Sequence, residues 1–141
     1  MATKRPPLPA PKPVLELAVS RDDAKARIQE RIEKGFQLKQ HRVETRETFE
    51  VLSNDYSKWD SFNSELLKRL FTTDEMAKEY NSWGAMSMRE RSLGEKFADL
   101  YKNIDKKIHR LDSIIERLVL IPLCGIVQAE VLTQQASAVQ L

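Results

Sequence analysis

Apolar side chains recur at alternating intervals of three and four residues along one segment of the chain, and this spacing constrains the fold more than any other feature of the sequence. One heptad position holds Phe97, Ile104, Leu111 and Leu118, and the other holds Leu93, Leu100, Lys107 and Ile114. Lys107 is the one polar residue in this series. Such a repeat predicts a long helix, over about residues 89–120, that buries one stripe against a second helix.

A second segment, over about residues 44–71, carries a similar series. If Asn63 is counted as a member, the series has the same alternating spacing, and its apolar members are Phe49, Leu52, Tyr56, Trp59, Leu66 and Leu70. Phe62 and Leu67 flank the series and widen it, as the helices of globular proteins require. The two segments are joined by a connection of about 17 residues, so the simplest arrangement is an antiparallel pair of long helices.

Local signals define the shorter elements that precede this pair. Ser20 with Asp23 three residues later resembles a capping box and predicts the start of an N-terminal helix. Gly35 weakens that helix, which ends there or continues to about His41. The β-prone residues 14–19 are expected to lie extended against the helices.

Thr72 and Glu75 also have the spacing of a capping box, which predicts a short connecting helix through about Asn81. The predicted fold class is therefore all-α: a small helical bundle in which an antiparallel pair of long heptad helices is joined by an N-terminal helix and a short connecting helix. A composition with 31% charged residues and 4 Gly agrees with this class. The predicted organisation is a disordered Pro-rich tail (1–13), a helical bundle domain (14–121) and a C-terminal tail or short helix (122–141).

The composition argues against several classes of function. Basic and acidic residues, 23 and 21 in number, are intermixed, so we expect no specific nucleic-acid binding. No run of residues approaches the length of a membrane span and no signal peptide is evident, so we expect no membrane association and a cytoplasmic location. The single cysteine, Cys124, cannot form an internal disulfide and is expected to be a buried, inert thiol.

The residue types that carry catalysis are sparse. His41 and His109 have charged or polar neighbours and are expected to be solvated surface residues. The sequence contains no metal-ligand spacing and no glycine-rich phosphate loop, so we predict no catalytic residues, no metal and no cofactor. Aromatic residues near basic ones could instead form a surface for a ligand or partner, and the candidates are Lys68, Arg69, Tyr80 and Trp83. Tyr80 and Trp83 could equally belong to the core.

Three stretches of the chain resemble the N-terminal helical region of prokaryotic TIR-like predicted nucleotide-binding proteins. They are SRDDAKARIQERIEKG (20–35), WDSFNSELLKRLFT (59–72) with EYNSW (79–83), and KIHRLDSIIERLVL (107–120). In that family the helical region precedes a TIR-like α/β domain with a Val-His-Gly-type motif, and some members degrade NAD in antiphage defence after a nucleotide signal. Residues 122–141 show neither that motif nor βα alternation, so no NAD-cleaving glutamate can be carried over.

Two functional hypotheses follow. The first is a non-enzymatic interaction module that mediates self-association or regulates a TIR-like effector. Its contacts would be made through the heptad seam, which we define as Phe49, Leu52, Tyr56, Trp59, Leu66, Leu70, Leu93, Phe97, Leu100, Ile104, Leu111, Ile114 and Leu118. The alternative is a sensor that binds a small nucleotide near Tyr80, Trp83, Lys68 and Arg69 and controls a TIR-like effector.

Overall fold

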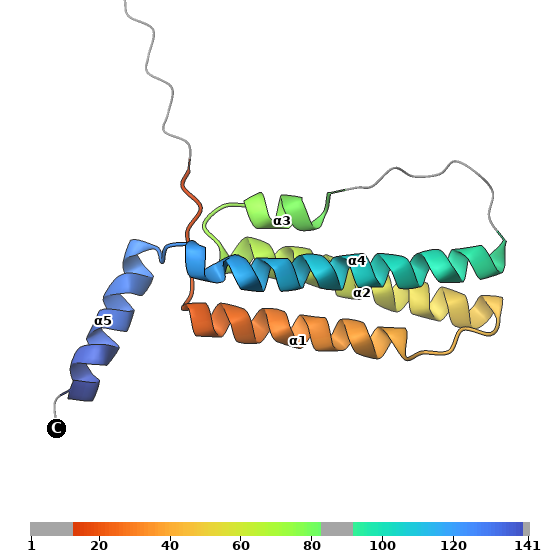
Figure 1. Ribbon diagram of the computed structural model, residues 1–141, viewed down its shortest axis with the longest axis horizontal. Helices are drawn as coiled ribbons and strands as arrows, with labels where there is room; N and C mark the ends of the chain where they lie inside the picture. Colours follow the sequence, from red (N-terminus) through yellow and green to blue (C-terminus); the bar gives the residue numbers. More distant parts are fainter. Residues whose placement is uncertain (1–12, 83–91, 140–141) are drawn as a thin grey trace, which may run out of the picture.

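The computed structural model describes residues 13–82 and 92–139, with the backbone alone described at 136–139. The elements, in chain order, are α1 (Arg21–Lys39), α2 (Arg46–Leu70), α3 (Glu75–Tyr80), α4 (Leu93–Arg117), a 3₁₀ turn (Leu118–Leu120) and α5 (Gly125–Val139). The helices α1, α2 and α4 lie side by side, α3 lies along the bundle, and α5 projects away from it (Figure 1). The predicted all-α class and small helical bundle are confirmed.

Side-chain caps begin the long helices where the sequence supplies small hydroxyl residues. Ser20 Oγ accepts a hydrogen bond from the backbone N–H of Asp23 at 3.1 Å, as predicted for α1. Thr45 caps α2 and forms a reciprocal capping box with Thr48. Ser92 caps α4, because its Oγ accepts a hydrogen bond from the backbone N–H of Glu95 at 3.3 Å. Each cap satisfies a backbone donor that the first helical turn leaves unpaired.

The direction of α4 differs from the predicted antiparallel pairing. The rings of Phe49 and Phe97, near the starts of α2 and α4, lie 5.1 Å apart, and Asp60 pairs with Lys107 further along. The two helices with heptad series are therefore parallel to each other, and both are antiparallel to α1 (Figure 1). The antiparallel prediction assumed that the connection between the two helices is too short to run back along α2. A 25-residue helix is only about 37 Å long, and the residues between Leu70 and Leu93 are numerous enough to span that distance.

The helix α1 contacts α4 more extensively than α2 does, so it is an equal partner in a three-helix core. Gly35 permits this close approach. A Cβ atom at Gly35 would lie 2.7 Å from Cζ2 of Trp59 and 2.9 Å from Cγ1 of Ile108. The glycine that the sequence presented as a weak point of α1 is thus the point where α1 fits against both other long helices.

Replacing Gly35 by alanine should therefore destabilise the fold, although alanine is the better helix former. Overpacking costs about 1–3 kcal/mol and outweighs a helix-propensity gain of about 0.5–1 kcal/mol. Gly94→Ala in α4 is the matched control, because a Cβ there meets no atom within 4 Å. Urea denaturation should show a lower free energy of unfolding for Gly35→Ala and an unchanged or higher one for Gly94→Ala. Equal effects of the two substitutions would contradict this account of Gly35.

The extended segment before α1 closes one end of the bundle, as expected for residues 14–19. Leu17 forms an antiparallel bridge with Phe71 and a parallel bridge with Leu123, and its side chain is fully buried. Thr72 belongs to this junction: its Oγ1 accepts from the backbone N–H of Glu16 at 2.8 Å. The predicted capping box of Thr72 with Glu75 is wrong, because the hydroxyl is engaged by the N-terminal segment.

Candidate interaction surface

Most of the heptad seam lies inside the bundle. Leu93 is 37% exposed, and Phe49, Tyr56, Leu66 and Phe97 are half-buried. The remaining seam residues are buried: Leu52, Trp59, Leu70, Leu100, Ile104, Leu111, Ile114 and Leu118. These side chains form the core of one chain, and a surface for a partner has to lie elsewhere.

Leu67, which the sequence placed beside the seam, and Ile108 of α4 are core residues. Leu67 is fully buried whereas its neighbour Leu66 is only half-buried, and Ile108 is 7% exposed. The reason is geometric: α2 and α4 each face two helices rather than one, so the buried stripe is wider than an a/d pair. The α-helical repeat of 3.6 residues brings Leu67 onto the same face as Asn63.

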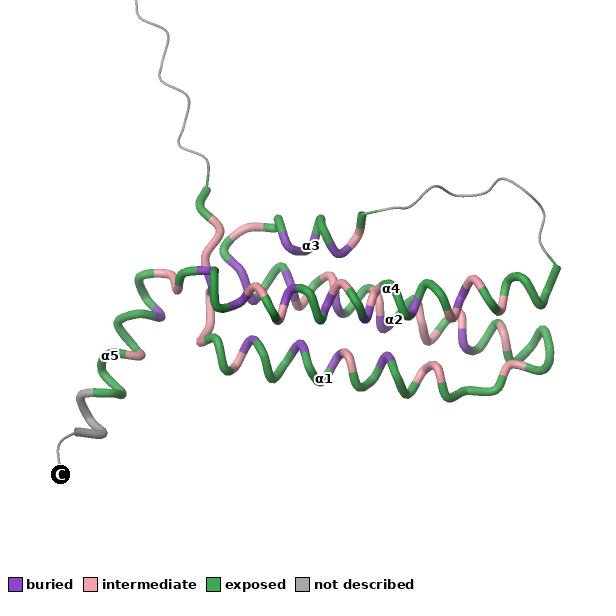
Figure 2. The backbone as a smooth tube through the Cα atoms, viewed as in Figure 1, coloured by how far each residue is buried: buried purple, intermediate pink, exposed green. Residues whose placement is uncertain are grey.

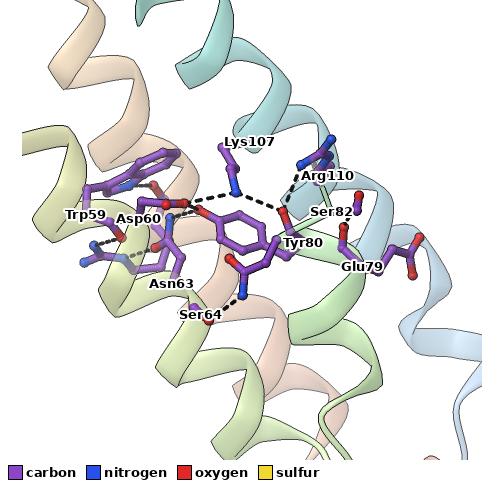
Figure 3. A network of polar contacts seen from close by, with 11 residues as sticks. Trp59, Asp60, Asn63, Ser64, Glu79, Tyr80, Ser82, Lys107 and Arg110 are labelled. Carbon is purple, nitrogen blue, oxygen red and sulfur yellow. Dashed lines mark hydrogen bonds and ion pairs between the residues drawn. The ribbon is translucent and has the colours of Figure 1, made fainter. Parts of the chain in front are cut away.

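The polar residues of the two series meet in one network around Tyr80 (Figure 3). Asn63 Nδ2 donates to the Tyr80 hydroxyl at 2.9 Å, and that hydroxyl donates to Asp60 Oδ1 at 2.7 Å. Lys107 Nζ lies 3.3 Å from Asp60 Oδ1 and donates to the Tyr80 carbonyl oxygen at 3.0 Å. Arg110 donates to the same carbonyl, at the C-terminal end of α3, where cations are favoured.

The network continues to α1 through a buried guanidinium. Arg31 Nε donates to Asn63 Oδ1 at 2.6 Å, and the indole N–H of Trp59 donates to the Arg31 carbonyl oxygen at 2.8 Å. Burial lowers the pKa of Arg31 from its usual value. No buried side-chain nitrogen or oxygen in the described part of the chain lacks a hydrogen-bond partner. The network is therefore a fully satisfied structural element of the kind that holds helices in one register.

This placement changes the predicted ligand surface. Tyr80 is fully buried, so of the two alternatives predicted for it the core is correct and the exposed contact surface is wrong. Lys68 and Arg69 are exposed on α2, and Lys68 pairs with Glu65 at 3.3 Å. The prediction for Trp83 falls on a residue outside those that the structure describes. Desolvation raises the pKa of Tyr80 well above its usual range, which fits a neutral hydroxyl in the core.

The largest exposed apolar side chains near the C-terminal end of α4 lie in the 3₁₀ turn and in α5. Val119 and Leu120 are exposed in the turn, and Ile126 and Leu132 are 76% and 64% exposed in α5. Within the described residues, α5 makes no helix–helix contact with the bundle. Most of its described length is exposed (Figure 2). We call Val119, Leu120, Ile126 and Leu132 the α5 patch.

The apolar residues of α5 are spread around the helix and are not gathered on one face, and six of its fifteen residues are polar. Successive residues of a helix are 100° apart, so Ile126, Val127 and Leu132 point in three different directions. Glu130 is the one charged residue between Gly125 and Val139. Burial of these exposed apolar side chains against another surface would be favourable. In the sequence, the apolar run LVLIPLCGIV (118–127) was the available signal for this surface.

The other candidate chemical groups do not assemble into a site. His41 and His109 are exposed, as expected, and Cys124 is partly rather than fully buried. No three His, Cys, Asp or Glu residues among those described are placed to hold a metal ion. None of the described helices combines the length and apolar character needed to cross a membrane.

Comparisons with known proteins identify no relative of this chain. No family model, no curated protein and no solved structure matches it significantly. The physical features of the α5 patch and of the bundle surface therefore carry the functional argument.

Proposed function

We propose that this chain is a non-enzymatic interaction module that associates through α5, with a second copy of the chain as its partner. The single observation that carries the proposal is that α5 exposes most of its apolar side chains and, Val127 at its base being the buried exception, makes no helix–helix contact with the bundle in the described structure. A helix of about 15 residues is only marginally stable alone in water, so α5 gains most of its stability from what covers it.

The chemistry of α5 favours another protein helix over a lipid surface. Helices that lie on membranes combine an apolar face with a polar face rich in Lys and Arg. The sequence of α5 contains neither Lys nor Arg, and three of its six polar residues are glutamines. Glutamine side chains can both donate and accept hydrogen bonds, so two copies of α5 can pair without a charged partner.

Charge-introducing substitutions in the α5 patch test the proposal. Each buried Ile or Leu contributes about 1.5–3 kcal/mol, so the double variant Ile126→Lys/Leu132→Lys should weaken self-association by at least about a hundredfold. Light scattering and sedimentation over a concentration series should show a concentration-dependent dimer for the native chain and a monomer for the variant. A native chain that stays monomeric throughout would contradict self-association.

Val51→Lys provides the matched control. Val51 is another exposed apolar residue, but it lies near the start of α2, at the opposite end of the bundle from α5. This variant should dimerise as the native chain does, and circular dichroism should show that all the variants keep their helices. If Val51→Lys dissociates the dimer instead, the interface lies on the bundle rather than on α5.

The resemblance to the helical region of TIR-like proteins supports a more specific form of the proposal. In that form, α5 brings the module to a TIR-like effector or assembles such effectors. Co-purification of the chain with a purified TIR-like protein, compared between the native sequence and Ile126→Lys/Leu132→Lys, tests this form separately. Equal recovery of both would overturn the role of α5 in that contact.

A further inference from the structure

A hollow of about 400 Å³ opens between α1 and α2, on a part of the surface that neither the heptad seam nor the α5 patch includes. Its walls are Arg31, Lys34, Gln37 and Leu38 from α1, His41 just after the end of α1, and Lys58, Trp59 and Phe62 from α2. On α1 the spacing of three and four residues places these side chains on one face of the helix. The volume falls within the range of about 300–1,000 Å³ that small-molecule sites occupy.

The walls of the hollow carry positive charge without acidic residues to neutralise it. Arg31, Lys34 and Lys58 are basic, and none of the residues that line the hollow is Asp or Glu. Lys34 pairs with Glu30 at 3.4 Å through an exposed contact, which is weak in water. Lys58 has no hydrogen-bond or ion-pair partner among the residues that the structure describes. An anion entering the hollow would therefore meet lysines that are exposed and available.

An exposed aromatic ring, that of Phe62, lies beside these charged side chains. Phe62 is 55% exposed, although a large aromatic side chain gains from burial. The guanidinium carbon of Arg31 lies 4.2 Å from the centre of the Phe62 ring, a cation–π contact on one face of that ring. Since Arg31 is anchored by Asn63, this part of the wall is preorganised. A flat ligand ring can stack here at little entropic cost, while its anionic group reaches Lys34 or Lys58.

We propose that the hollow between α1 and α2 binds a small organic anion that carries a flat ring and a phosphate, of the size of a mononucleotide. This proposal is independent of association through α5. The lysines supply the charge that a phosphate requires, and Phe62 and Leu38 supply the apolar surface for the ring.

Titration of the full chain with AMP, adenosine and inorganic phosphate, followed by amide NMR shifts, tests the proposal. AMP should shift the amide signals of residues 31–41 and 58–62. Adenosine and inorganic phosphate should each bind at least about tenfold more weakly than AMP. Binding of inorganic phosphate as tightly as AMP would overturn the role of the ring. Absence of any shift at millimolar AMP would overturn the site.

Two charge reversals on α2 make the test specific to the hollow. Lys58→Glu should weaken AMP binding by about tenfold, because it removes an attractive charge and adds a repulsive one. Lys68→Glu makes the same change in net charge about 15 Å further along the helix, beyond the screening length at physiological salt. It should leave the affinity within about twofold of the native value. If Lys68→Glu weakens binding as much as Lys58→Glu does, the ligand lies near Lys68 and Arg69 and the proposal for the hollow fails.

Discussion

Asn63→Ala should lower the free energy of unfolding by about 3 kcal/mol, because it leaves the Arg31 guanidinium in the core without its closest hydrogen-bond acceptor. Asn63 is fully buried, and the bond from Arg31 Nε to its Oδ1 is 2.6 Å long. The substitution also removes the donor to the Tyr80 hydroxyl. Chemical denaturation followed by circular dichroism measures the loss.

Two further variants separate this mechanism from a simple loss of volume. Asn54→Ala, at an exposed position on the same helix, should change the stability by less than about 0.5 kcal/mol. The double variant Arg31→Met/Asn63→Leu should recover much of the loss, because replacing both partners by apolar side chains removes the buried charge as well. A double variant that is less stable than Asn63→Ala would show that packing, and not the stranded charge, determines the effect.

Alkaline pH should unfold the chain through Tyr80. Burial raises the pKa of Tyr80 far above its usual value near 10, so the folded chain keeps a proton that the unfolded chain releases first. Stability contributed by the neutral hydroxyl is therefore complete below about pH 10 and falls above it, by about 1.4 kcal/mol per pH unit. Between pH 10 and 12 the expected loss from this one residue is about 2–3 kcal/mol.

Tyr80→Phe is the test variant for this pH dependence. It should be less stable than the native chain at pH 7, because Asp60 and Asn63 each lose one hydrogen bond, but its stability should fall less steeply above pH 10. Burial also raises the pKa of Tyr56 to about 12, so Tyr56→Phe should flatten the profile to a smaller extent because that side chain is only half-buried. Identical slopes for the native chain and Tyr80→Phe would contradict this explanation.

The sequence predicted the helices well because hydrophobic spacing and capping residues are local signals. The positions of the three long helices, the cap at Ser20 and the extended residues 14–19 all follow from residues close together in the chain. The direction of α4 relative to α2 could not be predicted in this way, because a heptad series has the same spacing whether its partner helix is parallel or antiparallel. The close fit of α1 at Gly35 likewise depends on Trp59 and Ile108, which are distant in sequence.

The polar network shows what a closer reading of the sequence could have found. Asn63 and Lys107 each interrupt an otherwise apolar series, and a polar side chain at such a position requires a buried partner. Two interruptions on two packed helices therefore indicate that polar groups meet in the core. The identity of the intervening partners, Asp60 and Tyr80, could not be predicted because Tyr80 reaches the site from the separate helix α3.

The junction at Leu17 determines how α5 can act on whatever it binds. The backbone of Leu17 donates to Pro122 and accepts from Cys124, at 2.8 and 2.9 Å, while Ala18 donates to Leu70. The base of α5 is thus clamped to both the start of α1 and the end of α2. A partner that pulls on α5 would therefore act on α1 and α2 together, through these hydrogen bonds, and not on a single segment. The base of α5 therefore has a fixed position on the bundle, although α5 makes no contact with the other described helices.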